Sequence, residues 1–324
     1  MDPRRILLLI ATAALATGTA EAQLTRGALG GQPAMWANEG DGDSLIQGEG
    51  NTFIDESTVR TAREIASHST GTPVWKIPAG FEKDAFIFAR VLFRKGPLRD
   101  DPPNYYGRLG WWVDFPDADL NFSYRLQSLT TIRTDPDCRV IKLTSPELTD
   151  FPLLYMEHVE NLRLREVEVD ILRRYLFNGG ALLINDTWND TAWRSFASEM
   201  NRVMPGREWT ELTTEHPIFH CVFELRGAMN SFQVPTSQFW NGTGSRGRNT
   251  ALPLQWRDRG AGTENMHVRA LLDDKGRLMV LAIVNSDVSD GWEREGENAD
   301  YFHTFSEKIS YPLGVNIVFY LMTH

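Results

Sequence analysis

Residues 164–193 read LREVEVDILRRYLFNGGALLINDTWNDTAW, and this stretch decides the fold. Apolar residues recur every three to four positions in its first half, as an amphipathic helix requires, at Leu164, Val167, Ile171, Leu172, Tyr175 and Leu176. Asn178-Gly179-Gly180 predicts the end of that helix, because glycine readily adopts the left-handed conformation found there. The apolar run 181–184 predicts a strand covered on both faces, and a second helix is expected at about 191–204. The stretch therefore predicts a helix–strand–helix unit of a parallel α/β sheet.

Polar residues follow this central strand at once. Asn185 and Asp186 end the apolar run, and Trp188 lies two positions further on. Open parallel sheets bind their ligands outside the carboxyl ends of the strands. We therefore identify Asn185, Asp186 and Trp188 as candidate ligand-binding residues.

The rest of the chain continues the alternation of strands and helices. Apolar runs predict strands at 85–93, 139–143 and 151–156, and Asp119 is a suitable cap for a helix that continues to about residue 129. Residues 267–285 predict a hairpin around Asp274-Lys275-Gly276, and a final helix is expected at 312–322. The predicted fold class is an α/β layered sandwich with a mostly parallel sheet and an antiparallel hairpin.

The first residues have the features of a secretory signal. Arg4 and Arg5 precede the apolar run 6–16, and Ala20-Glu21-Ala22 provides a cleavage site before Gln23. We predict a signal peptide at 1–22, a flexible leader with a short helix at 23–80, and one α/β domain at 81–324. The expected location is periplasmic or secreted, in a bacterium, and no later stretch is apolar enough to predict a transmembrane segment.

Composition excludes some classes of partner. The formal net charge is −10, which argues against nucleic acid as a partner. The chain has 2 cysteines, Cys138 and Cys221, and both lie among apolar neighbours. We expect them to be free thiols in the core rather than a disulfide.

Carboxylates at strand ends are the strongest chemical signal. Asp287, Asp290 and Glu293 follow the predicted strand LMVLAIVN, as Asp186 follows the central strand, and His158 follows FPLLYME. If the strands are neighbours, these groups converge at one edge, where they can hold a divalent cation or serve in acid–base chemistry. The metal candidates are Asp186, Asp287 and Asp290, and the catalytic candidates are Asp186, His158 and Glu293. The alternative is that these residues cap helices and shape turns.

A loop rich in proline, glycine and aromatic residues supplies two more ligand-binding candidates, Trp112 and Asp114. Its aromatic members are Tyr105, Tyr106, Trp111, Trp112 and Phe115. Aromatic side chains often line ligand grooves, but they also cover sheets, and we favour packing for most of them.

Other motifs carry less information. His216 and His220 have the spacing of a helical metal pair but lack the glutamate of a metalloprotease, and His216-Pro217 favours a turn. The segment 242–247 matches G-x-G-x-x-G without the strand and helix that a dinucleotide site requires, and we predict a loop. Its basic neighbours are predicted to form a solvated surface; they are Arg246, Arg248, Arg257 and Arg259.

With these residues in view, the chain resembles the bacterial family known as domain of unknown function 4159. The resemblance rests on an ordered set of pieces, which are FIFARVLF, Trp112-Val113-Asp114-Phe115-Pro116, FPLLYMEH, the unit 168–186, the helix 199–205, His216-Pro217-Ile218-Phe219, and Gly276-Arg277 leading to Asp287 and Trp292-Glu293. Together they cover nearly everything from about Phe81 to the end. The resemblance implies a flavodoxin-like fold similar to the class I glutamine amidotransferases.

An amidotransferase needs a cysteine nucleophile on a tight strand-to-helix elbow. Cys138 opens a strand and Cys221 follows His220 without flanking glycines, so neither matches. Two functions remain from the sequence: a non-catalytic binding or assembly module that works with other envelope proteins, or a carboxylate- or metal-dependent hydrolase acting on a carbohydrate-like substrate. A nucleotide-using enzyme ranks last, because only the fold analogy and the weak glycine motif support it.

Overall fold

The computed structural model describes residues 45–47, 52–69, 71–94, 110–237, 240 and 262–324. The chain divides into two units, Met1–Gly42 and Asp43–His324, and all described residues belong to the second. The predicted signal peptide therefore lies outside the described residues. Among the described residues, no helix combines the length and apolar content that a membrane span requires.

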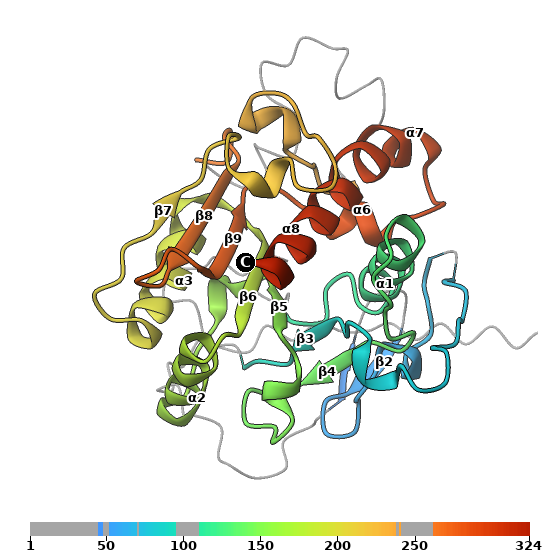
Figure 1. The fold of residues 1–324 in the computed structure, drawn as a ribbon, viewed down its shortest axis with the longest axis horizontal. Coiled ribbons are helices and arrows are strands. Elements are labelled where there is room, and N and C mark those ends of the chain that lie inside the picture. The colour runs from blue at the N-terminus through green and yellow to red at the C-terminus, as the bar shows by residue number, and fades with distance from the viewer. Residues whose placement is uncertain (1–44, 48–51, 70, 95–109, 238–239, 241–261) are drawn as a thin grey trace, which may run out of the picture. The chain divides into compact units, whose positions relative to one another are not determined.

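A seven-stranded mixed sheet forms the centre of this unit (Figure 1). In spatial order its strands are β4 (Arg139–Ile141), β3 (Ala89–Val91), β5 (Leu153–Glu157), β6 (Ala181–Thr187), β9 (Leu278–Val284), β8 (His267–Leu272) and β7 (Thr210–Glu211). The strands from β4 to β9 are parallel, while β8 and β7 are antiparallel to their neighbours. The predicted mostly parallel sheet with a late hairpin is confirmed.

Helices cover both faces of the sheet (Figure 1). The regular helices are α1 (Asp117–Leu129), α2 (Glu166–Phe177), α3 (Asn189–Val203), α6 (Asp290–Glu293), α7 (Ala299–Tyr301), the π-helix η10 (Phe302–Ser310) and α8 (Tyr311–Thr323). Short 3-10 turns connect them, at η2 (Ala62–Glu64), η3 (Glu82–Asp84), η5 (Leu148–Asp150), η6 (Val159–Asn161), η7 (Pro217–Phe219) and η8 (Met229–Phe232). Helices α2 and α3 contact each other, and α1 contacts α6 and α8.

The chain changes direction across the sheet between β3 and β5. From β3 the chain passes through α1 to β4 on one side, and from β5 it passes through α2 to β6 on the other. Because such crossovers are right-handed, opposite directions place α1 and α2 on opposite faces. The gap between β3 and β5 is therefore a topological switch point, where open α/β sheets bind ligands at the carboxyl ends of the strands.

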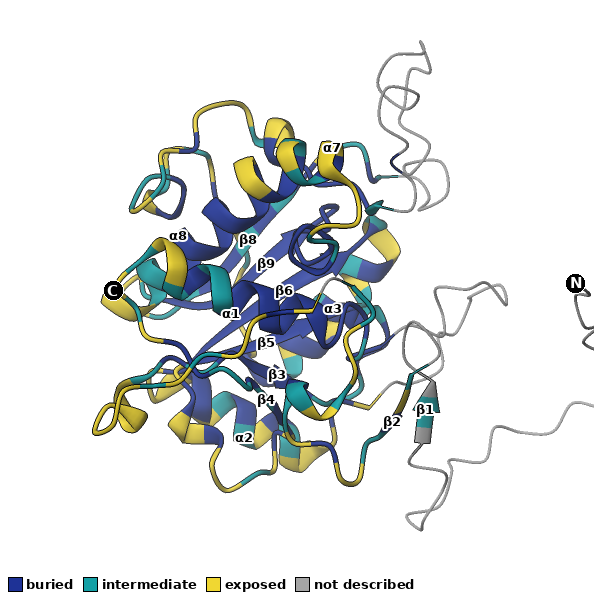
Figure 2. Ribbon diagram, turned by 90° about the vertical axis from the view of Figure 1, so that its right-hand side faces the viewer, coloured by how far each residue is buried: buried dark blue, intermediate teal, exposed yellow. Residues whose placement is uncertain are grey.

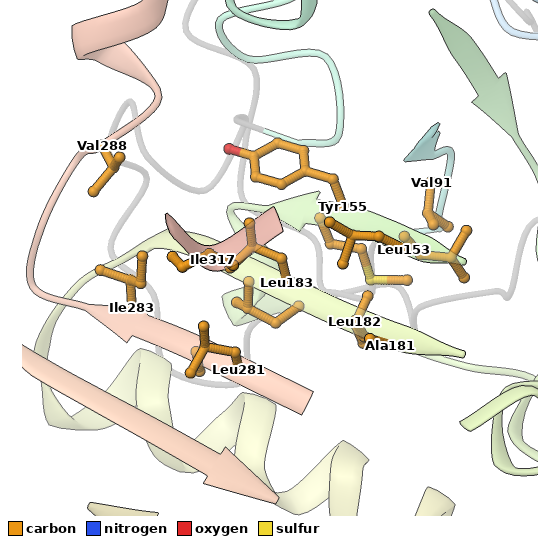
Figure 3. Close-up of a cluster of buried hydrophobic side chains, with 14 of the residues drawn as sticks. Val91, Leu153, Tyr155, Ala181, Leu182, Leu183, Leu281, Ile283, Val288 and Ile317 are labelled. Atoms are coloured by element: carbon orange, nitrogen blue, oxygen red, sulfur yellow. The ribbon is translucent and has the colours of Figure 1, made fainter. Parts of the chain in front are cut away.

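The core lies along β6 and β9, whose residues are all buried (Figure 2). Figure 3 shows Leu183 of β6 and Leu281 of β9 close to Ile317 of α8. Tyr175 of α2 donates its hydroxyl hydrogen bond to the Phe151 carbonyl at 2.8 Å, at the amino end of the sheet. A Cβ at Gly180 would lie 2.3 Å from the Tyr175 ring, so only glycine fits at this close approach.

A segment before β3, residues 52–80, packs against the domain. Arg63 Nε donates to the Pro136 carbonyl at 2.9 Å, and Trp75 Nε1 donates to the Thr134 carbonyl at 2.8 Å. Its first residues form β2 (Phe53–Asp55), which pairs with β1 (Leu45–Gln47). We name residues 52–80 the N-terminal strap. The sequence predicts a flexible leader at 23–80, whereas the described part of that range makes specific contacts with the domain.

Several element boundaries differ from the sequence-based expectation. The strand expected at 85–93 is regular only at β3, and its central Arg90 bonds to Asp119 of α1. Asp119 was expected to cap a helix, but α1 begins at Asp117 and Asp119 bonds to Arg90 instead. Both cysteines are free thiols, as expected.

Candidate metal centre

Three strand ends at the carboxyl edge carry polar residues in the left-handed backbone conformation. His158 follows β5 with φ 49°, Asp186 lies near the end of β6 with φ 50°, and Asn285 follows β9 with φ 61°. Asp114, in the turn before α1, has φ 58°. Non-glycine residues adopt this conformation only when their surroundings hold them there, and such residues cluster at functional sites.

Asp114, Asp287 and Asp290 converge at this edge. One carboxylate oxygen from each lies within 4.8 Å of the others, and all three residues are buried, at 4%, 2% and 2% exposure. We name these three residues the carboxylate triad. This combination of hard oxygen donors is the one that divalent cations such as Ca²⁺ and Mg²⁺ prefer.

Two elements bring the triad together. The chain turns sharply after β9 and enters α6 at Asp290, where the Asp290 amide donates to Asp287 Oδ1 at 3.1 Å. The turn that carries Asp114 leads directly into α1, which contacts α6. The segment before residue 238 adds two hydrogen bonds, since Thr236 Oγ1 donates to Asp287 Oδ2 at 2.7 Å and the Ser237 amide donates to Asp290 Oδ2.

A buried arginine lies at the switch point beside the triad. Arg90 of β3 is fully buried, and its guanidinium bonds to Asp119 of α1 and Glu157 at the end of β5. Burial alone lowers the pKa of Arg90, but the charges of Asp119 and Glu157 raise it well above its usual value. Burial raises the pKa of Glu157 to about 7, although the charges of Arg90 and His158 act in the opposite direction.

A second pair, His158 and Asp186, joins the ends of β5 and β6. His158 Nε2 bonds to Asp186, and Nδ1 lies 3.3 Å from Glu160 Oε1. Burial disfavours the imidazolium, yet the charges of Asp186 and Glu160 raise the pKa of His158 well above its usual value. Carboxylates therefore flank both ring nitrogens of His158, and this arrangement favours its charged form.

The N-terminal strap contributes a third group of charges. His68 Nε2 lies 3.4 Å from Asp117 Oδ2 and 3.4 Å from Glu293 Oε1. The His68 amide donates to Asp117 Oδ2 at 2.9 Å. Arg294 Nε lies 2.5 Å from Glu293 Oε2. The strap therefore supplies a histidine to carboxylates from both α1 and α6.

In the described part of the chain, buried acidic groups outnumber buried basic groups at this edge. Eight carboxylates there are at most 4% exposed, namely Asp114, Asp117, Asp119, Glu157, Asp186, Asp287, Asp290 and Glu293. Among the described residues of this edge, only Arg90 and His158 are basic groups of comparable burial. The side chains of His68 and Arg294 are 7% and 24% exposed. The described part of this edge therefore offers several buried carboxylate oxygens, which are possible ligands for a cation.

Only two of the three metal candidates predicted from the sequence belong to the carboxylate triad. Asp287 and Asp290 of the predicted metal set come together with Asp114, but Asp186 bonds to His158 and Trp188 instead. Strands β6 and β9 are indeed neighbours. Asp186 itself has a left-handed backbone conformation, with φ 50°.

The remaining candidates have structural partners. Asn185 Nδ2 donates to Ser289 Oγ at 2.7 Å and so connects β6 to the turn after β9. Trp112 is half-buried and packs edge-on against Trp111. Glu293 lies beside His68 rather than in the triad. Among the weaker motifs, His220 bonds to Glu224 and to the Thr214 carbonyl, as a structural histidine does.

Some predicted features lie outside the described residues. They are Tyr105, Tyr106, the glycine motif at 242–247, and the basic positions Arg246, Arg248, Arg257 and Arg259.

Sequence reasoning did not identify several residues of this edge, namely Arg90, Asp117, Asp119, Glu157, His68 and Thr236. One signal was available, because Arg90 is a single charge inside the apolar run FIFARVLF. An arginine in a buried strand must have acidic or carbonyl partners, although the sequence does not show which ones.

One known family matches this chain, and its description names no activity. The family described as a domain of unknown function (DUF4159) matches residues 105–322, which is well over half of the 324-residue chain. A search of curated proteins finds no match. The matched range contains Asp114, Asp287 and Asp290, and it begins after the N-terminal strap and β3. The chain belongs to the DUF4159 family.

Proposed function

We propose that this protein is an exported binding module that holds a divalent cation at the carboxylate triad. The convergence of three buried carboxylates within 4.8 Å carries the proposal. A flavodoxin-like fold similar to the class I glutamine amidotransferases is part of it, and the seven-stranded α/β sheet with its switch point beside Arg90 supports that assignment. A role with other proteins of the bacterial envelope follows from the predicted signal peptide.

The cation is supported by the energetics of burying like charges. Carboxylates that share a small site repel one another, and a shared cation relieves that repulsion. Thr236 Oγ1 and the amides of Ser237 and Asp290 donate hydrogen bonds to the triad, and these bonds hold the Asp287 and Asp290 carboxylates in place. Ionised carboxylates arranged in this way form a site for a doubly charged cation.

Ligand type indicates which cation is bound. All three donors are carboxylate oxygens, with neither histidine nitrogen nor cysteine sulfur among them. Oxygen-only sites favour Ca²⁺, Mg²⁺ or Mn²⁺ over Zn²⁺ or copper. We therefore expect a hard divalent cation at the triad.

A thermal-unfolding titration tests the proposal. Ca²⁺, Mg²⁺ and Mn²⁺ are each added to chelator-treated protein, and a cation that binds only the folded state stabilises it by about 2.7 kcal/mol at one hundred times its Kd. The wild type should show a saturable rise in Tm. Asp287→Asn should lose that rise, while Asp300→Asn, which changes an exposed aspartate, should keep it.

In chelator, the expected effect of Asp287→Asn on stability has the opposite sign. Asp287→Asn removes one of three mutually repelling charges, so without cation it should be at least as stable as the wild type. With saturating cation it should be less stable. The proposal is wrong if none of the three cations raises the Tm of the wild type. It is also wrong if the Tm of Asp287→Asn rises as that of the wild type does.

A cation-dependent hydrolase is the second candidate function. Glu157 favours it, because a carboxylate with a pKa of about 7 can exchange a proton near neutral pH at the same edge of the sheet. The cation would activate a water molecule for attack on a carbohydrate-like substrate. Cation-dependent release of a chromogenic sugar, abolished in both Asp287→Asn and Glu157→Gln, would support this function. The absence of release across a glycoside panel would leave the binding module as the proposal.

A further inference from the structure

We infer that Arg90 is a positioning residue for the carboxylate triad, because its guanidinium holds the turn that presents Asp114. The inference rests on the proposed cation site and names the residue that organises it. The hydrogen bonds of Arg90 go to Asp119, to Glu157 and to backbone carbonyls, and none goes to a triad carboxylate, so Arg90 acts through the backbone of the turn.

The contacts are specific to the two ends of the turn. Arg90 Nη1 donates to the Trp111 carbonyl and to the Val113 carbonyl, both at 2.9 Å. The Val113 carbonyl belongs to the peptide group that joins Val113 to Asp114. Fixing that carbonyl fixes the direction from which the Asp114 side chain leaves the backbone.

Asp114 needs this restraint because of its conformation. Its φ is 58°, in the left-handed region that non-glycine residues occupy at a cost of about 1–2 kcal/mol. On its other side, the Asp114 carbonyl accepts a hydrogen bond from the Ala118 amide at 2.9 Å, in the first turn of α1. Arg90 before Asp114 and α1 after it therefore hold the residue from both sides.

Arg90 is held in place by its own contacts, so it can restrain the turn that carries Asp114. Its Nε donates to both carboxylate oxygens of Asp119, at 3.0 and 2.9 Å, and Nη1 also bonds to Glu157. Its guanidinium lies 5.0 Å from the centre of the Tyr155 ring. A lysine keeps the charge but offers one compact ammonium instead of a planar fork of donors, so it cannot make all of these bonds.

Calorimetric titration of the cation that binds the wild type tests the inference. Arg90→Lys should weaken cation binding roughly 10- to 100-fold, the usual effect of removing a group that supports a metal ligand. Tyr175→Phe, which loses a hydrogen bond at the amino end of the same sheet, controls for lowered stability and should leave the Kd within about threefold. In an Asp114→Asn background, Arg90→Lys should add no further loss, because both changes act through one side chain.

Asp119→Asn provides a milder variant in case Arg90→Lys does not fold. It keeps Arg90 but weakens its attachment to α1, and it should weaken cation binding by a smaller factor in the same direction. Unchanged cation affinity in a folded Arg90→Lys protein, or additive losses in the Asp114→Asn background, would overturn the inference.

Amide hydrogen exchange in chelator makes the test independent of the cation. In Arg90→Lys or Asp119→Asn, the amides of residues 113–115, 117 and 118 should exchange at least about tenfold faster than in the wild type, while those of α2 should not change. Unchanged exchange in the turn refutes the positioning role. If the wild type binds no cation, the proposed function fails, and the exchange result alone then decides whether Arg90 holds the turn.

Discussion

Glu157 gives a prediction whose sign and size both follow from its surroundings. The residue is fully buried at the end of β5, where it bonds to Arg90 and accepts a hydrogen bond from the Tyr155 hydroxyl at 2.7 Å. Burial raises its pKa from 4.5 to about 7. Between these two values the folded protein keeps the Glu157 proton, whereas the unfolded chain has released it. Unfolding therefore releases a proton in this range, and the stability that Glu157 contributes falls as the pH rises.

The size follows from the shift. A change from 4.5 to about 7 corresponds to about 3 kcal/mol of folding free energy, lost between pH 4.5 and 7 and constant above that window. Other carboxylates also titrate there, so the quantity to measure is the difference between the wild type and Glu157→Gln. This difference isolates the titration of Glu157, because glutamine has nearly the same shape and does not ionise in this pH range.

Urea unfolding followed by tryptophan fluorescence provides the assay. Both proteins are unfolded in chelator at fixed ionic strength and at half-unit steps from pH 4 to 8. The stability of the wild type relative to Glu157→Gln should decrease by about 3 kcal/mol across this range. A wild type that gains stability relative to Glu157→Gln as the pH rises would refute the reasoning, since it would mean that Arg90 outweighs burial and lowers this pKa.

Two further predictions concern the packing and the charges at the same edge. A Cβ at Gly291 of α6 would lie 2.0 Å from Ser310 Oγ and 2.6 Å from Ser310 Cβ, so Gly291→Ala should lower the free energy of unfolding by about 1–3 kcal/mol. Adding Ser310→Gly should restore part of that loss in denaturant titrations, and no restoration would place the strain elsewhere. Asp186→Asn leaves the buried His158 with one carboxylate instead of two, and should cost about 3–5 kcal/mol at pH 7. The cost should shrink when His158→Gln is also present, and an undiminished cost would contradict the ion pair.

Local patterns in the sequence predict the elements of this fold well. The apolar run at 181–184 and the helical spacing before it correspond to β6 and α2. The turn at Asp273 forms as predicted, with the Asp273 amide bonded to the Arg277 carbonyl at 3.0 Å. Each of these elements is specified by residues a few positions apart, which is the range over which periodicity and turn chemistry act.

The site is less predictable, because its partners are far apart in the chain. Strand ends direct attention to Asp287 and Asp290, but Asp114 lies in the turn before α1, and no local pattern places it beside them. Arg90 meets Asp119 and Glu157, which lie 29 and 67 positions away. No local pattern encodes such a set, since buried charges choose their partners from whatever the tertiary fold brings near.

The contacts of the N-terminal strap have a consequence for the order in which the protein forms during synthesis. Ser69 Oγ donates to the Glu295 carbonyl, across 226 positions, and His68 lies beside Glu293. At about 5–20 residues per second, a ribosome needs roughly 10 to 45 s to make the partners of this segment after the segment itself has emerged. The early strands can pair during that time, but the edge that carries the triad cannot close. We expect a nascent chain stalled before residue 287 to remain sensitive to protease within the strap, and the site to be completed among the last events of folding.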